Sequence, residues 1–184
     1  QDHQHASTGA KLPGVGAEMQ AMIASNEIAG AITAVVTKDK VLHFETTGSA
    51  DVAAARPMTP ETLFWIASMT KPVTGVAVLI LQDEGKLDPA APVTDYVPEV
   101  ARSAYAGATV QQVLDMTTAI DYSEDYADPN SSFLPYARAA GMMPLPPGYT
   151  GPTSIYEFVR GIAKSGTHGT EFHYRSLNTD VLGW

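Results

Sequence analysis

The sequence predicts an α/β fold of the α+β type, in which an antiparallel β-hairpin is followed by a mainly helical region. Two runs rich in β-branched and aromatic residues, 31–37 and 41–46, are separated by three polar residues, a pattern typical of a hairpin. Apolar residues then recur at helical spacing from Val73 to Leu81 and fill nearly all faces of that helix, which we therefore expect to be central and buried. Strands grouped ahead of helices, rather than alternating with them, favour the α+β class.

The other elements follow from local signals along the chain. Proline, glycine and polar clusters mark the connections, and apolar spacing marks the helices. In chain order, we expect a helix over 15–25, a loop over 48–60, an extended segment over 62–65, a helix from about 68 to 85, a short helix over 110–116, an irregular region over 117–152, a helix over 153–163, an extended segment over 172–174 and a final helix from 177.

These elements suggest three parts. Residues 1–14 are expected to be a flexible tail, 15–66 the N-terminal helix and hairpin of a sheet subdomain, and 67–184 a helical subdomain that carries the active-site motifs. A two-stranded sheet is rarely stable by itself, and no stop signal follows the last helix. We therefore expect the chain to be the N-terminal part of a larger folding unit, whose remainder is either missing or supplied by a second polypeptide.

Composition excludes several classes of function. The 184 residues are 45% hydrophobic and carry a net charge of −9, and no apolar run reaches membrane-spanning length. Neither nucleic acid nor a membrane is an expected partner, because both would be repelled by so acidic a surface. The absence of cysteine rules out thiolate metal sites and cysteine nucleophiles, and no cofactor is expected. The polar start at Gln1 suggests a periplasmic or secreted protein after signal-peptide removal, with a cytoplasmic location as the alternative.

The clearest chemical motif is Ser68-Met69-Thr70-Lys71 at a predicted helix start. Pro72 fits only the first turn of a helix, where its missing N–H has no partner to lose. A spacing of three places Ser68 and Lys71 on one helix face. Lys71 in its neutral form, favoured by burial or a nearby cation, could take the Ser68 proton, and the helix N-terminus would stabilise an oxyanion.

A second group of hydroxyl residues lies at the turn before the final helix. Tyr174 could relay the Ser68 proton to a leaving group, and Ser176 could complete that relay or cap the helix. Without Ser68, Tyr174 would more simply be read as a packed aromatic residue with a satisfied hydroxyl.

Together, the two motifs resemble the serine β-lactamase and penicillin-binding-protein superfamily, on the branch that holds class C β-lactamases, family VIII carboxylesterases and nylon-oligomer (6-aminohexanoate-oligomer) hydrolases. The resemblance implies a β-lactamase/transpeptidase-like fold, an antiparallel sheet with a helical subdomain. Ser68-Met69-Thr70-Lys71 matches the first family motif and Tyr174-Arg175-Ser176 the second. Ser176 in place of the asparagine of β-lactamases points away from lactam antibiotics. The text around Glu124-Asp125-Tyr126 is most similar to the nylon-oligomer group, which implies that Tyr126 lies over the site and assists a leaving amine.

The third family motif, Lys-Thr-Gly or an equivalent, is expected on a strand after the tyrosine motif. Lys164-Ser165-Gly166 has similar letters but precedes Tyr174, and we interpret it as a helix C-terminus. The resemblance therefore implies that this chain alone is inactive.

Two other sites were considered. The acidic residues Asp121, Glu124, Asp125 and Asp128 lack EF-hand spacing, so a solvated acidic loop is favoured over a metal site, and attraction of a cationic substrate end is a third possibility. No Gly-x-Ser-x-Gly elbow supports a Ser-His-Asp hydrolase.

The predicted function is a serine hydrolase that cleaves a carboxylic ester or linear amide through an acyl-enzyme on Ser68. Lys71 and Tyr174 are its proton-transfer pair, and Ser176 and Tyr126 are auxiliary. One alternative is β-lactamase or D-alanyl-D-alanine carboxypeptidase activity. Another is a catalytically silent binding protein on the same scaffold.

Overall fold

The computed structural model describes residues 11–184, and the chain divides into two compact units, residues 1–65 and 66–184. The prediction of a flexible tail over 1–14 falls largely on residues outside the described part. Within it, the Lys11 ammonium pairs with the Glu45 carboxylate at 2.7 Å, and the Leu12 N–H donates to His43 Nδ1. Over residues 11–184, no helix combines the length and the apolar character needed to cross a membrane.

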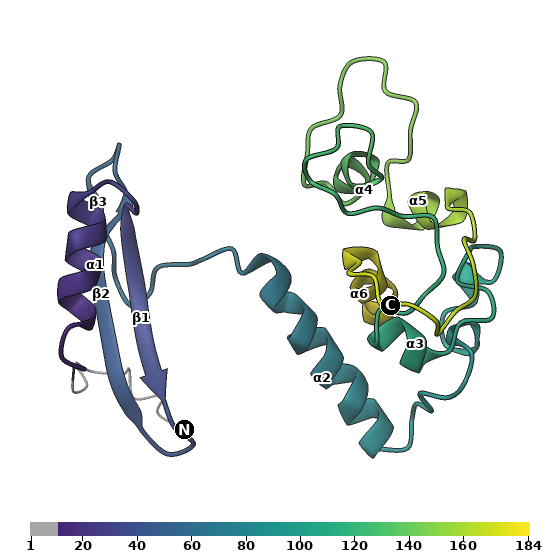
Figure 1. Cartoon of the computed structure of the whole chain (residues 1–184), viewed down its shortest axis with the longest axis horizontal. Helices are drawn as coiled ribbons and strands as arrows, with labels where there is room; N and C mark the ends of the chain where they lie inside the picture. Colours follow the sequence, from purple (N-terminus) through teal and green to yellow (C-terminus); the bar gives the residue numbers. More distant parts are fainter. Residues whose placement is uncertain (1–10) are drawn as a thin grey trace. The chain divides into compact units, whose positions relative to one another are not determined.

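The first unit consists of one helix and a three-stranded antiparallel sheet in the order β1-β2-β3 (Figure 1). Its elements are α1 (Val15–Ala24), β1 (Gly30–Val36), β2 (Val41–Asp51) and β3 (Arg56–Pro57). Helix α1 contacts both β1 and β2. The fully buried His43 of β2 is held by the Thr33 hydroxyl of β1 at 2.8 Å from its Nε2. The predicted helix and hairpin are present.

The predicted loop over 48–60 is wrong at its start, because β2 continues to Asp51 and then pairs with β3. Gly48 suggested a turn but lies within the strand, with a φ of +76°. A Cβ at this position would come within 2.6 Å of the Ile23 side chain. The glycine therefore allows α1 to pack close to the strand, which is one of the few uses of glycine inside a strand.

The second unit is helical and carries every candidate site residue. Its elements are the short 3₁₀ turns η1 (Ala67–Met69), η2 (Val93–Asp95) and η3 (Pro98–Val100), and the helices α2 (Thr70–Asp83), α3 (Val110–Leu114), α4 (Phe133–Ala139), α5 (Ile155–Gly161) and α6 (Ser176–Gly183).

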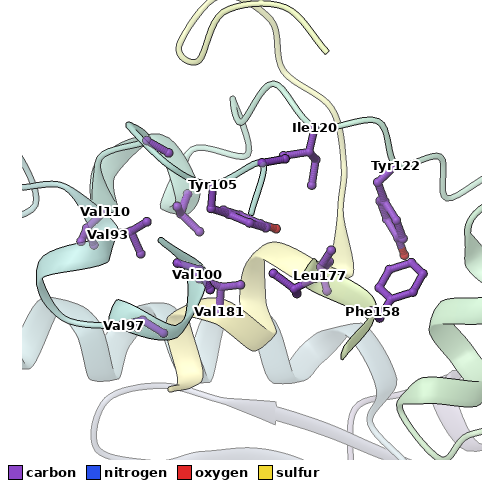
Figure 2. Close-up of a cluster of buried hydrophobic side chains, with 14 of the residues drawn as sticks. Val93, Val97, Val100, Tyr105, Val110, Ile120, Tyr122, Phe158, Leu177 and Val181 are labelled. Carbon is purple, nitrogen blue, oxygen red and sulfur yellow. The ribbon is translucent and has the colours of Figure 1, made fainter. Parts of the chain in front are cut away.

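Helix α6 is at the centre of this unit, in contact with both α2 and α3. Figure 2 shows Leu177 and Val181 of α6 pointing into the cluster around Val100 and Tyr105. The buried Asn178 accepts hydrogen bonds from the Tyr105 and Thr118 hydroxyls and donates one to the Val113 carbonyl. Because an asparagine side chain can satisfy several polar groups at once, Asn178 connects α6 to three other segments without leaving its own amide unpaired.

Three predictions about this unit need correction. The irregular region over 117–152 contains α4, whose apolar residues were attributed to a loop because prolines and glycines surround them. Helix α5 ends at Gly161, two residues early, and Lys164 forms a β-bridge with Ile120 instead of a helix C-terminus. Helix α2 is apolar on nearly all of its faces, as expected, but it is not buried. Only Val78 among its residues is buried, because α2 contacts α6 along one face.

The turn before α6 is fixed by Arg175, which is 6% exposed. Its guanidinium donates to the backbone carbonyls of Thr118, Ile120 and Tyr122 at 2.6, 3.0 and 3.4 Å. The planar fork of arginine suits such a divergent set of acceptors, whereas a lysine would be a single point charge. Arg175 therefore holds the strand-like segment 118–122 against the turn that carries the second motif.

Replacing Arg175 by alanine in the full-length protein is expected to lower the free energy of unfolding by about 3 kcal/mol, because three buried carbonyls lose their donor. Urea denaturation followed by circular dichroism measures the change. Arg160→Ala is the control, since Arg160 is an exposed residue of α5 and its loss should cost less than about 0.5 kcal/mol. Equal unfolding midpoints for the two variants would contradict this role of Arg175.

Candidate active site

Ser68 lies in a short 3₁₀ turn that leads directly into α2. The preceding residue, Ala67, has a φ of +45°, a left-handed conformation that costs a non-glycine residue about 1–2 kcal/mol. This conformation redirects the chain so that Ser68 and Lys71 begin a new helical segment. Pro72 follows in the first turn of α2, as its missing N–H requires.

The Ser68 hydroxyl is in contact with two candidate proton carriers. Lys71 Nζ donates to Ser68 Oγ at 3.1 Å, and the Tyr174 hydroxyl donates to the same oxygen at 2.7 Å. Lys71 comes from the first turn of α2, directly after the 3₁₀ turn that holds Ser68, and Tyr174 comes from a turn 106 residues after Ser68. The structure thus brings the three predicted catalytic residues together on one oxygen atom.

Lys71 is held in place from two further directions. Its Nζ donates to Ser176 Oγ at 2.9 Å and lies 4.7 Å from the centre of the Tyr174 ring. The first contact is a hydrogen bond, and the second is a cation–π geometry. Ser176, predicted as a relay or a cap, is the first residue of α6 and contacts Lys71 directly.

Tyr174 has an environment suited to proton transfer. Partial burial raises the pKa of the Tyr174 hydroxyl, but the interaction with Lys71 and the hydrogen bond with Ser68 lower it by more, so that its pKa lies below the ordinary value of 10.0. A tyrosine with a lowered pKa loses its proton more readily and can serve as a base and then as an acid at lower pH than a free tyrosine.

Glu124 is the site residue that sequence reasoning missed. Its carboxylate accepts hydrogen bonds from the backbone N–H and the hydroxyl of Ser176, at 2.6 and 2.5 Å, and from the hydroxyls of Tyr126 and Tyr122, at 2.7 and 3.4 Å. The prediction of a solvated acidic loop is therefore wrong for Glu124. One feature of the sequence could have indicated Glu124. The motifs place several hydroxyl groups near Lys71, and so many hydrogen-bond donors in one place require an acceptor such as a carboxylate.

Its acidic neighbours behave differently. Asp125 and Asp128 are exposed and accept only from backbone N–H groups two residues ahead of them. Within residues 11–184, no group of three or more acidic, histidine or cysteine side chains could hold a metal ion.

Tyr126 lies beside Glu124. Its hydroxyl bonds to Glu124, its ring packs edge-on against Phe133 at 4.7 Å, and 66% of the residue is exposed. Desolvation and the bond to Glu124 raise the pKa of Tyr126 to about 12, so this tyrosine keeps its proton at neutral pH. The structure connects Tyr126 to Ser176 through Glu124.

A polar cavity of about 430 Å³ opens on the Tyr174 side of this group. Tyr174, Glu124 and Tyr122 line it together with Asp121 and Glu171. Arg175 and His173 also line it, whereas Ser68 and Lys71 do not, so the cavity could accommodate a polar part of a small molecule beside the serine.

The sequence profile of the beta-lactamase family matches residues 15–184. The chain belongs to the beta-lactamase family. Among curated relatives, the 6-aminohexanoate-dimer hydrolase of Paenarthrobacter ureafaciens is 46% identical over 125 residues, which are 68% of this chain and 31% of the relative. Esterase EstB of Burkholderia gladioli is 34% identical over 121 residues, or 64% of this chain and 30% of the relative.

Solved structures of the beta-lactamase family have the same fold. The putative 6-aminohexanoate-dimer hydrolase from Bacillus anthracis superposes with a TM-score of 0.69 at 20% identity, over 90% of this chain and 41% of that structure. A class C beta-lactamase in complex with cefoxitin gives a TM-score of 0.66 at 22% identity, over 91% of this chain and 41% of that structure. These relatives place the chain on the class C and esterase branch and confirm the predicted β-lactamase/transpeptidase-like fold. The chain spans less than half of each of them.

Proposed function

We propose that the full-length protein is a serine hydrolase that cleaves a carboxylic ester or a linear amide through an acyl-enzyme on Ser68. The observation that carries this proposal is the meeting of Lys71 Nζ and the Tyr174 hydroxyl on Ser68 Oγ. A serine becomes nucleophilic when an adjacent base takes its proton, and two groups able to exchange protons are already within hydrogen-bonding distance.

The reaction follows from these contacts. Ser68 Oγ attacks the substrate carbonyl while its proton passes to neutral Lys71 or to ionised Tyr174. The Ser68 N–H, near the N-terminus of α2, is one donor to the resulting oxyanion. Tyr174 then gives a proton to the leaving alcohol or amine as the carbon–heteroatom bond breaks. Water attacks the acyl-enzyme, and Ser68 regains its proton.

The relatives support the choice of ester or linear amide over lactam. One is a 6-aminohexanoate-dimer hydrolase and another is an esterase, by their own names. Ser176 in place of asparagine agrees with this choice. Tyr126 is the auxiliary residue proposed to contact a leaving amine, because its protonated hydroxyl is exposed beside the site.

Covalent labelling tests this proposal without knowledge of the natural substrate. Treatment of the full-length protein with a fluorophosphonate is expected to add one phosphonyl group, located on Ser68 by peptide mass spectrometry. Hydrolysis of a panel of p-nitrophenyl esters, linear amides and a chromogenic cephalosporin then ranks the substrate classes. Absence of labelling would leave the catalytically silent binding protein, and preference for the cephalosporin would favour the lactamase alternative.

A further inference from the structure

Beyond Lys71 and Tyr174, the two groups that meet at Ser68, the structure contains a carboxylate that contacts Ser176, the other hydrogen-bond partner of Lys71. Glu124 is half-buried and uses both of its oxygens. Oε1 accepts from the Ser176 and Tyr126 hydroxyls, and Oε2 accepts from the Ser176 N–H and the Tyr122 hydroxyl. An ionised carboxylate is an acceptor only, so each of these partners must donate to it.

This constraint determines the orientation of the Ser176 hydroxyl. A serine hydroxyl has a single proton, and the 2.5 Å contact assigns it to Glu124 Oε1. Ser176 Oγ can then only accept from Lys71, as its 2.9 Å contact with Nζ requires. The hydrogen bonds therefore run in one direction, from Lys71 to Ser176 to Glu124.

That direction matters for the step of the proposed reaction in which Lys71, as a neutral amine, takes the Ser68 proton. A neutral amine has two protons and one lone pair. With three protons, Nζ donates to both Ser68 and Ser176. With two protons, one of them on Ser176, its lone pair can accept the proton of Ser68 along the same 3.1 Å contact. If the Ser176 hydroxyl were free to rotate, it could donate to that lone pair instead and block the transfer from Ser68.

We propose that Glu124 is a positioning residue that keeps the Lys71 lone pair directed at Ser68 by holding the Ser176 hydroxyl as an acceptor. This inference rests on the proposed function and adds to it a fourth residue, one that acts through Ser176 without touching Ser68. Glu124 also accepts a hydrogen bond from the first N–H of α6, that of Ser176. The N-cap residue of this helix, Arg175, makes no capping hydrogen bond with its own side chain. The test must therefore separate positioning from helix capping.

Glu124→Gln is the informative change, because glutamine has nearly the same shape but only one acceptor oxygen and an NH₂ group that opposes the Ser176 donors. The rate of Ser68 labelling by the fluorophosphonate is expected to fall about tenfold to a hundredfold, the range for loss of a charge-assisted hydrogen bond. Asp125→Asn is the matched control: it removes the adjacent exposed carboxylate but keeps the acceptor for its local turn, and it should change the rate less than about twofold.

A double-mutant cycle with Ser176→Ala decides the mechanism. If Glu124 acts through the Ser176 hydroxyl, Glu124→Gln should slow labelling by less than about twofold once that hydroxyl is absent. A helix-capping role would slow labelling equally in both backgrounds, because the Ser176 backbone N–H remains, and that result would overturn the inference. Glu124→Asp, which keeps a carboxylate, provides the same cycle if the glutamine variant does not fold. Failure of the wild-type protein to label would instead refute the proposed function.

Discussion

Replacement of Ser68 by alanine in the full-length protein is expected to abolish fluorophosphonate labelling and to lower kcat/KM for an ester or amide substrate by at least about 10⁴-fold. The physical reason is the removal of the only oxygen on which Lys71 and Tyr174 converge. What remains is binding and oxyanion stabilisation, which accelerate hydrolysis only weakly. Steady-state kinetics and intact-protein mass spectrometry measure the two effects.

Ser165→Ala is the control for this prediction. Ser165 belongs to the Lys164-Ser165-Gly166 segment, whose sequence is similar to the Lys-Thr-Gly motif of the family. Its backbone N–H donates a hydrogen bond to the Ala119 carbonyl. Alanine retains that bond, so labelling of Ser68 should be unchanged; the control is limited to labelling because Ser165 also lines the cavity beside Tyr174. Normal turnover by the Ser68 variant would place the nucleophile elsewhere and would contradict the assigned role of Ser68.

Replacement of Tyr174 by phenylalanine is expected to slow the acylation of Ser68 by about 10²- to 10⁴-fold, the usual contribution of a positioned acid or base. Phenylalanine keeps the ring, which lies 4.7 Å from Lys71 Nζ, and removes only the hydroxyl that contacts Ser68 at 2.7 Å. The loss therefore reports on proton transfer and not on packing. Stopped-flow kinetics with an activated ester measures the acylation rate.

The lowered pKa of Tyr174 also predicts how the acylation rate changes with pH. The interaction with Lys71 and the bond with Ser68 outweigh desolvation and lower the Tyr174 pKa below 10.0, so the ionised base is populated at lower pH than for a free tyrosine. The wild-type acylation rate should fall as pH drops through that lowered pKa, and the Tyr174→Phe variant should lose this limb of the profile. Tyr156→Phe is the control, since Tyr156 is equally exposed, at 41%, and stacks on Trp184. An unchanged profile in the Tyr174 variant would assign the base to another group.

The predictions that held depend on short-range chemistry. The hairpin, α1 and the start of α2 follow from apolar spacing, polar turn residues and the position of Pro72, all of which act within a few residues. Ser68 in η1 and Lys71 in the first turn of α2 are three residues apart along one continuous helical path, so their proximity follows from local helical geometry. Helix α4 was missed because its seven residues, including Pro135, carry too weak a periodic signal among the surrounding prolines.

Glu124 could not be predicted in the same way. Its four hydrogen-bond donors come from positions 122, 126 and 176, and the last of these lies on a helix 52 residues away. In the sequence, Glu124, Asp125 and Asp128 look alike, and only the folded chain makes one of them a half-buried acceptor and leaves the others in water. Burial in the folded chain distinguishes Glu124 from the other two carboxylates, and a local sequence pattern contains no information about that burial.

The sequence by itself determined the two motifs, Ser68 with Lys71 and Tyr174 with Ser176, and the family fold, because a helix start and a few spaced side chains suffice for these. The tertiary structure decided which groups lie within hydrogen-bonding distance of these motifs. The buried Arg175 holds segment 118–122 against the turn before α6, and this contact brings Glu124 to Ser176 and Tyr174 to Ser68. Hydrogen bonds form only over distances near 3 Å, so the direction of proton flow depends on long-range packing that a linear sequence does not display.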